Sequence, residues 1–298
     1  MMGKDARYIP GWDCHGLPIE WKIEEEYRSK GKNKDDVDII DFRQECRKFA
    51  AGWVETQREE FKRLGVMGKW ENPYLTMDFH AERVIAEEFM TFLMNGTLYQ
   101  GSKPVMWSPV EKTALAEAEI EYHDHKSHTI WVAFKIKSAS AEISKARIVI
   151  WTTTPWTIPS NRAIAFNPKI SYGLYHVDET SEESWTAKGD YYIIADNLAS
   201  ETLEKSRVTK HTRVKDVLSS ELKDCVCQHP FSELDSFWSY DVPVIDGDHV
   251  TDDAGTGFVH TAPSHGADDY ECFLKRNWLD RMTHNVGEES EFLAHVPF

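Results

Sequence analysis

The sequence reads IWVAFKI at residues 130–136, RIVIW at 147–151 and YYIIA at 191–195, three short runs of β-branched and aromatic residues. Runs of this kind, bounded by polar turns, predict β-strands. GTGFVH at 255–260 predicts a further strand that is entered through glycines. We therefore expect the part of the chain after Lys126 to be rich in β-structure.

The residues before this β-rich part predict helices. From 41 to 64, apolar side chains recur mostly in steps of three and four, the pattern of one helix face, at Phe42, Cys46, Phe49, Trp53, Phe61 and Leu64. Asp41 and Gln44 predict the N-terminal cap of this helix, and Gly65 predicts its end. A second helix is expected at 78–95 before Gly96, with one face formed by Ala81, Ile85, Phe89 and Phe92. A short third helix is expected at 196–205.

Composition sets outer limits on the class of protein. The chain has 298 residues, a length typical of about two domains, and 50 acidic against 34 basic side chains give a net charge of −16. This charge disfavours broad binding to a phosphate backbone. The sequence contains no apolar run of the roughly 20 residues that span a bilayer, and no apolar segment of a secretory signal follows Met1. The 5 cysteines are irregularly spaced, which favours reduced thiols in a cytosolic protein.

The first segment that ordinary folding does not require is PGWDCHGLPIE at 10–20. Its two glycines and two prolines predict irregular backbone, which places Asp13 and His15 on a loop. A carboxylate held there could bind an ammonium group. The alternative is a turn with solvated polar side chains.

The second segment is WTTTPWTIPSN at 151–161. Its two prolines prevent the preceding strand from continuing as a central strand, so several hydroxyls and a tryptophan gather on a constrained loop. Hydroxyls can orient a water molecule or a substrate oxygen, but they are not strong bases. The alternative is a threonine-rich edge or turn.

The third segment is GTGFVHTAPSHGADDY at 255–270. Adjacent side chains diverge, so Asp268 and Asp269 are not expected to face one site together, and one of them could cap the following helix. His260, His265 and Asp269 could instead be metal ligands, although their spacing fits no common template. The histidines at 123, 125 and 128 favour a solvated turn over a ligand set.

Taken together, these three segments resemble the class I aminoacyl-tRNA synthetases, and within that family the isoleucine-specific branch. The segment at 10–20 is similar to the isoleucine enzymes rather than to their valine relatives, and 151–159 and 255–263 are similar to the two signature segments of the editing domain. The similarity includes TALAEAE at 113–119 and runs through nearly the whole chain. The His-x-Gly-His and Lys-Met-Ser-Lys-Ser signatures of the class are absent from the sequence, and no Cys-Pro-x-Cys zinc knuckle follows Trp107.

The resemblance implies an α/β protein with two parts. Residues 1–125 would be a partial Rossmann-type catalytic, nucleotide-binding domain. Residues 126–298 would be an inserted β-rich editing domain of the CP1 type, truncated at its C-terminus. The chain is thus expected to be a fragment of a longer enzyme and not to be competent for aminoacylation by itself.

The resemblance also implies the chemistry. The parent enzyme would ligate isoleucine to tRNA(Ile) with ATP and Mg2+, and this part would hydrolyse mischarged valyl-tRNA(Ile). One methylene separates valine from isoleucine, and the known discrimination for this pair in an apolar pocket is only about 1–3 kcal/mol, so a second site must remove valine. The expected partners are the acceptor end of tRNA(Ile), isoleucine, and valine as the edited amino acid. A cytoplasmic monomer without a membrane partner is expected.

The residue roles follow from the same resemblance. Asp269 would anchor the α-ammonium of the misacylated amino acid, and Thr152, Thr153 and Thr154 would line the water and the terminal adenosine. Trp156 would form a wall, His260 would set the size limit, and Asp13 would bind the ammonium of isoleucine in the catalytic part. No metal or cofactor is expected in the editing site. The alternatives are a metal-dependent hydrolase that uses His260, His265 and Asp269, and a non-catalytic module that binds the tRNA acceptor end.

Overall fold

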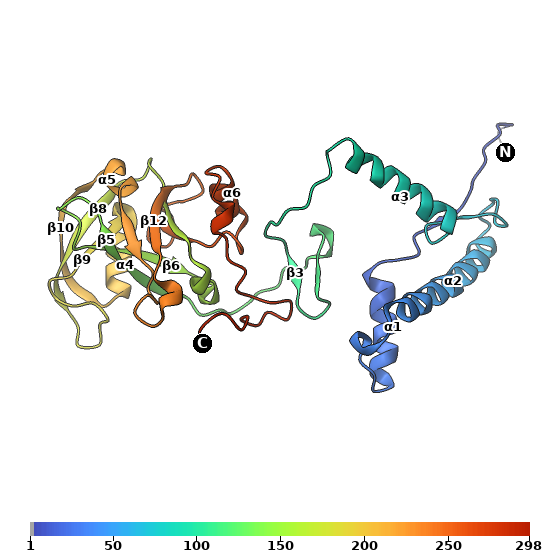
Figure 1. Cartoon of the computed structure of the whole chain (residues 1–298), viewed down its shortest axis with the longest axis horizontal. Coiled ribbons are helices and arrows are strands. Elements are labelled where there is room, and N and C mark those ends of the chain that lie inside the picture. Colours follow the sequence, from blue (N-terminus) through green and yellow to red (C-terminus); the bar gives the residue numbers. More distant parts are fainter. Residues whose placement is uncertain (1–2) are drawn as a thin grey trace. The chain divides into compact units, whose positions relative to one another are not determined.

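The computed structural model describes residues 3–298, which form two compact units that divide between Gly101 and Ser102 (Figure 1). The predicted domain boundary lay at 125/126. The division falls earlier because residues 102–125 pack with the C-terminal segment: the indole Nε1–H of Trp107 donates to the carbonyl of Glu288 at 2.9 Å.

The N-terminal unit combines helices with a short pair of parallel strands. Its elements are β1 (Gly11–Trp12), α1 (Leu17–Ser29), the 3-10 helix η1 (Lys34–Asp36), α2 (Ile39–Arg63), β2 (Tyr74–Leu75) and α3 (Phe79–Met94). Strands β1 and β2 pair in parallel. The largest group of buried residues that contact one another in this unit is small: Cys14, Ala50 and Val54, with Trp12 and Leu75 packed against them.

Both long helices occur where the periodicity predicts them, but their details differ from the prediction. Asp38, not Asp41, caps α2, because its Oδ1 accepts the backbone N–H groups of Ile40 at 2.9 Å and Asp41 at 3.4 Å. Gly65 follows the end of α2 with a φ of +83°, a conformation that glycine adopts without strain. The predicted cap at Asp41 is therefore wrong, and the predicted end is confirmed.

The predicted apolar faces of these helices are only partly buried. The large residues at the C-terminal end of the predicted α2 face, Phe61 and Leu64, are exposed. On α3, Ala81 is buried, whereas Ile85, Phe89 and Phe92 are exposed. Periodicity located the helices correctly, but within this unit too few elements pack against them to cover the larger side chains.

The C-terminal unit is built on a nine-stranded sheet with the order β10-β8-β9-β6-β5-β11-β12-β7-β13 (Figure 1). Its sheet strands are β5 (Ile130–Ser138), β6 (Arg147–Thr152), β7 (Ala163–Phe166), β8 (Tyr172–Thr180), β9 (Tyr191–Ala195), β10 (Val208–Val217), β11 (Val226–Gln228), β12 (Asp241–Asp246) and β13 (Phe258–Thr261). The pairs β6–β9 and β7–β12 are parallel and the others are antiparallel. The four strands expected from the sequence are present, and the α/β prediction is confirmed.

Helices and a hairpin complete this unit. They are the hairpin β3 (Trp107–Ser108) and β4 (Thr113–Ala114), the helices α4 (Asp196–Lys205), α5 (Ser219–Lys223) and α6 (Ala267–Leu274), and the 3-10 helices η2 (Glu117–Glu119), η3 (Pro155–Ser160), η4 (Ser236–Trp238) and η5 (Leu279–Arg281). Helix α4 matches the predicted short helix. The main core lies on the sheet and contains fully buried side chains of Phe134, Ile148, Ile164 and Ile193.

The entry into β13 depends on glycine. Gly257 has a φ of +78°, and a Cβ added there would lie 2.2 Å from the Cβ of Ala195. No other residue fits this position without displacement of β9. The prediction that β13 is entered through glycines is confirmed, and this close packing fixes the start of the strand that carries His260.

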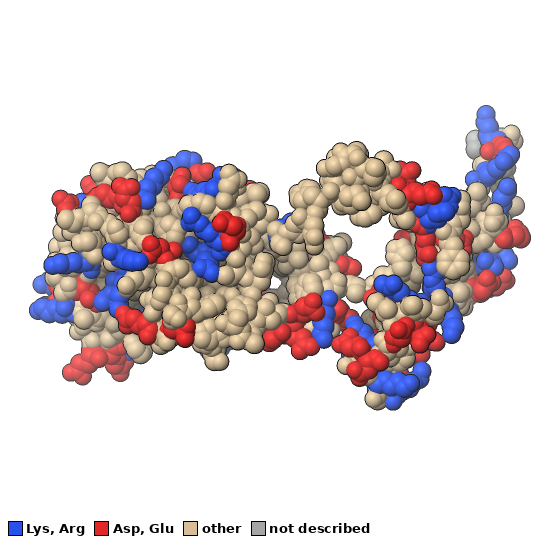
Figure 2. All heavy atoms as spheres, in the orientation of Figure 1, with Lys and Arg blue, Asp and Glu red and all other residues tan. Residues whose placement is uncertain are grey.

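Charged side chains of both signs are interspersed on the face of the molecule that Figure 2 shows. Within residues 3–298, no helix is long and apolar enough to cross a membrane.

Candidate functional site

The threonine segment begins where β6 ends. Thr152 is buried, and its Oγ1 accepts the backbone N–H of Thr154 at 3.1 Å. Thr153 is exposed at its side chain, while its carbonyl accepts the hydroxyl of Ser127 at 2.9 Å. Thr154 is exposed as well, with its Oγ1 3.4 Å from that of Thr152. The predicted constrained loop is the 3-10 helix η3, and the three threonines differ in their surroundings: one lies in the core and two face outward.

His260 on β13 is joined to this segment through Thr157. The Thr157 hydroxyl donates to the carbonyl of Thr154 at 2.8 Å, so it accepts from Nε2–H of His260, which lies 2.8 Å away. Nδ1 of His260 then accepts from the amide of Asn161 at 3.3 Å. This arrangement requires the neutral imidazole, and burial lowers the pKa of His260 to about 4. Both ring nitrogens are used within the fold, which makes His260 a fixed wall rather than a free base.

Asp269 lies near the end of β13, on α6. Its Oδ2 accepts the backbone N–H of Ala262 at 2.8 Å, and its Oδ1 makes no hydrogen bond with any residue of the described range 3–298. Burial raises the pKa of this carboxyl group, because the charged form loses its hydration. A cation next to Oδ1 would offset that cost.

The neighbouring carboxylate is placed differently. Asp268 is exposed, so the two side chains diverge as expected. Neither caps α6: the residue at the N-cap is Gly266, and no side chain caps the helix there. The prediction that one of the two aspartates caps this helix is therefore wrong, because Asp269 turns back to the end of β13 instead.

Trp156 lies at the mouth of a cavity in the C-terminal unit. Its ring meets the ring of His265 edge to face, with 4.9 Å between centroids. Nε2 of His265 lies 3.2 Å from the hydroxyl of Ser160, which in turn accepts from the amide of Asn285 at 3.1 Å. Trp156 and His265 line a cavity of about 870 Å³ whose other walls come from the β3–β4 hairpin, the residues just before it and the C-terminal segment.

The hypothesis of a metal site at His260, His265 and Asp269 is not supported by the contacts of these residues. Among residues 3–298, no group of three His, Cys, Asp or Glu side chains is placed to hold a metal ion. His123, His125 and His128 are exposed. His260, which that alternative needs, has both nitrogens engaged with Thr157 and Asn161.

The predicted residue of the N-terminal unit lies on the loop between β1 and α1. The side chain of Asp13 is exposed. The next three residues, Cys14, His15 and Gly16, line a pocket of about 380 Å³ together with Phe42 and other residues of α2. The structure thus places the predicted ammonium ligand next in sequence to three residues that line a pocket of its own unit.

The sequence did not single out Thr157 and Asn161. Both lie inside the segment 151–161, and their presence in a proline-constrained turn is the signal that could have identified them. Their role became visible only when β13 placed His260 against them.

Comparison with known proteins now identifies the family. Residues 1–227 match the family described as tRNA synthetases class I (I, L, M and V). The chain belongs to this family, and the resemblance noted in the sequence is confirmed.

The relatives within the family are isoleucine-specific. The chain is 55% identical over 304 residues to the isoleucine–tRNA ligase of Ruegeria pomeroyi, covering 100% of this chain and 31% of that protein. It is 57% identical over 279 residues to the isoleucine–tRNA ligase of Rhodopseudomonas palustris, covering 92% and 28%. The chain therefore spans about a third of the length of these relatives.

Solved structures show more distant similarity. The crystal structure of GlLeuRS-CP1 aligns with a TM-score of 0.39 at 16% identity, over 50% of this chain and 59% of that chain. A leucyl-tRNA synthetase from Agrobacterium radiobacter, in a ternary complex with tRNA, aligns with a TM-score of 0.32 at 17% identity, over 92% and 36%.

Proposed function

We propose that this chain carries the editing site of an isoleucine–tRNA ligase, which hydrolyses valyl-tRNA(Ile). The observation that carries the proposal is the half-buried carboxylate of Asp269, which leaves Oδ1 without a hydrogen bond inside the described range 3–298. An α-ammonium group beside it would replace lost hydration with an ion pair. Family membership supports an aminoacyl ester of tRNA as the source of that ammonium.

The reaction needs little beyond positioning, because an aminoacyl ester is already activated. A water molecule adds to the ester carbonyl carbon, the bond from that carbon to the ribose oxygen breaks, and the ribose oxygen takes up the proton that the water loses. The hydroxyls of Thr152, Thr153 and Thr154 would orient the water and the terminal adenosine. His260 takes no proton in this scheme, because its two nitrogens hold Thr157 and Asn161.

Selectivity would come from shape. The ring of His260 is 8% exposed and held from both sides, so it cannot move aside for a larger side chain at low cost. With Trp156 as a second wall, the site would admit valine and exclude isoleucine.

The remaining functions belong to the whole protein. It would bind isoleucine through Asp13, use ATP and Mg2+ to make the aminoacyl-adenylate, and transfer the amino acid to tRNA(Ile). We also propose that it works in the cytoplasm as a monomer.

A matched pair of aspartate variants tests the editing site. Asp269→Ala should lower kcat/KM for hydrolysis of valyl-tRNA(Ile) by about 100-fold, the effect of removing one partner of a partly buried ion pair. The exposed neighbour provides the control: Asp268→Ala should change the rate by about twofold or less. Release of labelled valine from the charged tRNA is the measurement, with isoleucyl-tRNA(Ile) as the substrate that should resist.

Three outcomes would contradict the proposal. Unchanged hydrolysis in Asp269→Ala would remove its central residue. Activity that EDTA abolishes and zinc restores would favour the metal-dependent hydrolase. Binding of the tRNA acceptor end without hydrolysis of either ester would favour a non-catalytic module.

A further inference from the structure

The C-terminal unit contains a second pocket that the proposed editing reaction does not use. It has a volume of about 410 Å³. Three aromatic residues line it, Trp131 on β5, Trp185 in the loop after β8, and Tyr192 on β9. Lys205 and Arg207, at the end of α4 and just beyond it, supply two positive charges, and no acidic residue lines the pocket.

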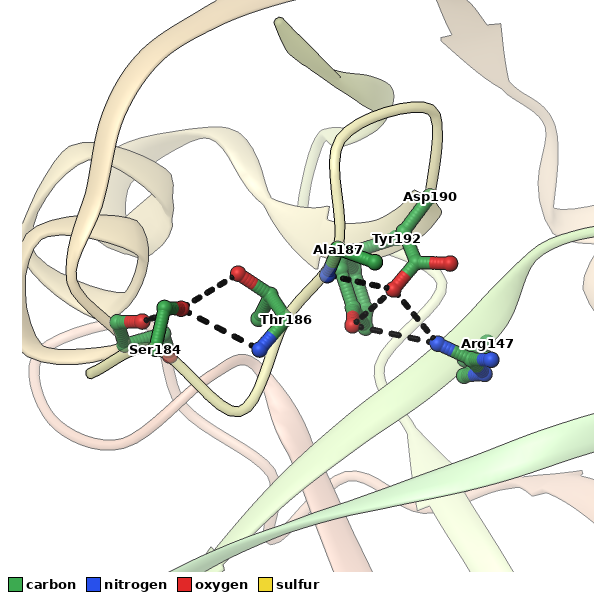
Figure 3. A network of polar contacts seen from close by, with 7 residues as sticks. Arg147, Ser184, Thr186, Ala187, Asp190 and Tyr192 are labelled. Atoms are coloured by element: carbon green, nitrogen blue, oxygen red, sulfur yellow. Dashed lines mark hydrogen bonds and ion pairs between the residues drawn. The ribbon is translucent and has the colours of Figure 1, made fainter. Parts of the chain in front are cut away.

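The loop that carries Trp185 is tied to the rest of the unit through residues on both sides of the tryptophan, as Figure 3 shows. The indole of Trp185 is fully exposed. On one side, the hydroxyl of Ser184 donates to the carbonyl of Ser206 at 2.7 Å and accepts the backbone N–H of Thr186 at 3.1 Å. The residue before the tryptophan is thereby tied to the end of α4, although nothing in the unit covers the ring itself.

The far side of the loop is anchored to the sheet (Figure 3). Oδ2 of Asp190 accepts the backbone N–H of Ala187 at 3.0 Å, the hydroxyl of Tyr192 at 3.0 Å and Nη1 of Arg147 at 2.8 Å. Burial opposes the charged form of Asp190, but the hydrogen bond from Ala187 and the charge of Arg147 outweigh it and lower the pKa of this carboxyl group. A fully exposed tryptophan held between two anchors has the properties of a stacking platform rather than of a loosely hanging loop.

Both cations of the pocket, Lys205 and Arg207, are held by contacts within the unit. The Nζ of Lys205 lies 5.5 Å from the ring centroid of Trp131 and 2.5 Å from a carboxylate oxygen of Glu201, outside the pocket. Arg207, which is ion-paired with Glu183, has a φ of +61° directly after the C-cap of α4. A left-handed position after a helix favours glycine. The backbone turn therefore gives no reason for an arginine at 207, and we attribute the arginine to a role of its side chain.

The pocket adjoins the threonine segment. Ile130 lines the pocket and pairs with Thr152 across β5 and β6. Ser127, two residues before the pocket residue Thr129, donates to the carbonyl of Thr153. A strand of RNA whose last nucleotide lies at the threonines could therefore place a nearby nucleotide in this pocket.

We propose that the pocket binds an unpaired nucleotide of the tRNA acceptor strand, with its base stacked on Trp185 and its phosphate next to Arg207 and Lys205. Aromatic faces beside cations are the general means by which proteins hold single-stranded nucleic acid. This inference rests on the proposed function, because it takes the same RNA as the ligand.

Binding of a labelled single-stranded tetranucleotide, ACCA, to the 298-residue chain tests the pocket. Trp185→Ala should weaken binding about tenfold, the usual effect of one lost stacking partner. Trp53→Ala, at a half-exposed tryptophan of the N-terminal unit, is the control and should leave the affinity unchanged. Arg207→Gly should weaken binding and reduce its salt dependence while thermal stability stays the same or rises, a combination that a purely structural role would not produce.

The results separate the pocket from the editing site. If Trp185→Ala and Arg207→Gly bind ACCA as tightly as the unchanged chain, or if the unchanged chain does not bind it, the pocket inference is wrong. Hydrolysis of 3′-O-valyl-adenosine, which has no preceding nucleotide, should be unaffected by both variants. A chain that hydrolyses no valyl ester but loses ACCA affinity in both variants would refute the proposed editing function and support the pocket.

Discussion

Replacement of Thr157 by valine tests whether a hydroxyl holds His260 in the neutral form that the site requires. Valine has nearly the same shape, so packing is kept while two hydrogen bonds of the hydroxyl, each 2.8 Å long, are lost. The carbonyl of Thr154 keeps the backbone N–H of residue 157 at 3.1 Å. The Nε2–H of His260 has no such substitute and becomes a buried, unpaired donor.

The cost follows from that orphaned donor. A buried polar group without a partner costs about 1–3 kcal/mol, and for a unit of this size about 2 kcal/mol corresponds to a fall in Tm of about 4–8 °C. Thr157→Ser keeps the hydroxyl and should lose much less. Thermal unfolding followed by circular dichroism measures both variants, and valyl-tRNA(Ile) hydrolysis by Thr157→Val should decline as well. A Tm of Thr157→Val equal to that of the unchanged chain would refute the hydrogen-bond assignment at His260.

Three further predictions concern glycine packing and pH. Gly257→Ala should lower the free energy of unfolding, measured with denaturant, by about 2–5 kcal/mol, because the backbone is left-handed and the added Cβ collides with β9. The control is Gly189→Ala, which has a φ of +96° but no atom within 4 Å of the added Cβ and should cost only about 1–2 kcal/mol. Equal losses in the two variants would contradict the packing argument. Burial raises the pKa of Asp269, so the stability of the chain falls as pH rises through that pKa. Asp269→Asn should therefore be more stable than the unchanged chain at pH 7 but not in acid. A variant that is less stable at pH 7 would contradict this prediction. Hydrogen bonds from Arg213 lower the pKa of Asp196 to about 2, so the stability that they provide is present above the ordinary carboxyl pKa and is lost as pH falls toward 2. In Arg213→Met, the free energy of unfolding that the chain loses on acidification should be smaller by about 1 kcal/mol, after solvent screening of this pair. An unchanged acid-unfolding curve would contradict this prediction.

The strands that the sequence revealed are those with a simple apolar pattern. β5, β6 and β9 are short runs of β-branched and aromatic residues, and they occur within two residues of the predicted positions. β10 was not predicted, because it is an edge strand whose residues are mostly polar or charged, as in KHTRVKD at 210–216. β8 begins with apolar residues but contains Gly173 and ends in acidic ones, so no single periodicity marks it.

The candidate site shows the same limit at the level of side chains. The sequence singled out His260 and the threonines, since both lie in segments that folding alone does not explain. It could not show that Thr157 and Asn161 take both nitrogens of His260, because the contact joins β13 to a turn about a hundred residues earlier. The resemblance placed all three threonines around the water and the terminal adenosine, and the structure shows that of these three only Thr152 is buried.

The central claim is that Asp269 binds the ammonium group of the amino acid to be removed. A crystal structure of this chain with a non-hydrolysable valyl-adenosine amide measures the relevant distance directly. The account predicts the α-nitrogen at about 2.8 Å from Oδ1 of Asp269, the length of a charge-assisted hydrogen bond. An α-nitrogen more than about 4 Å from both carboxylate oxygens, beyond the reach of an ion pair, would contradict it.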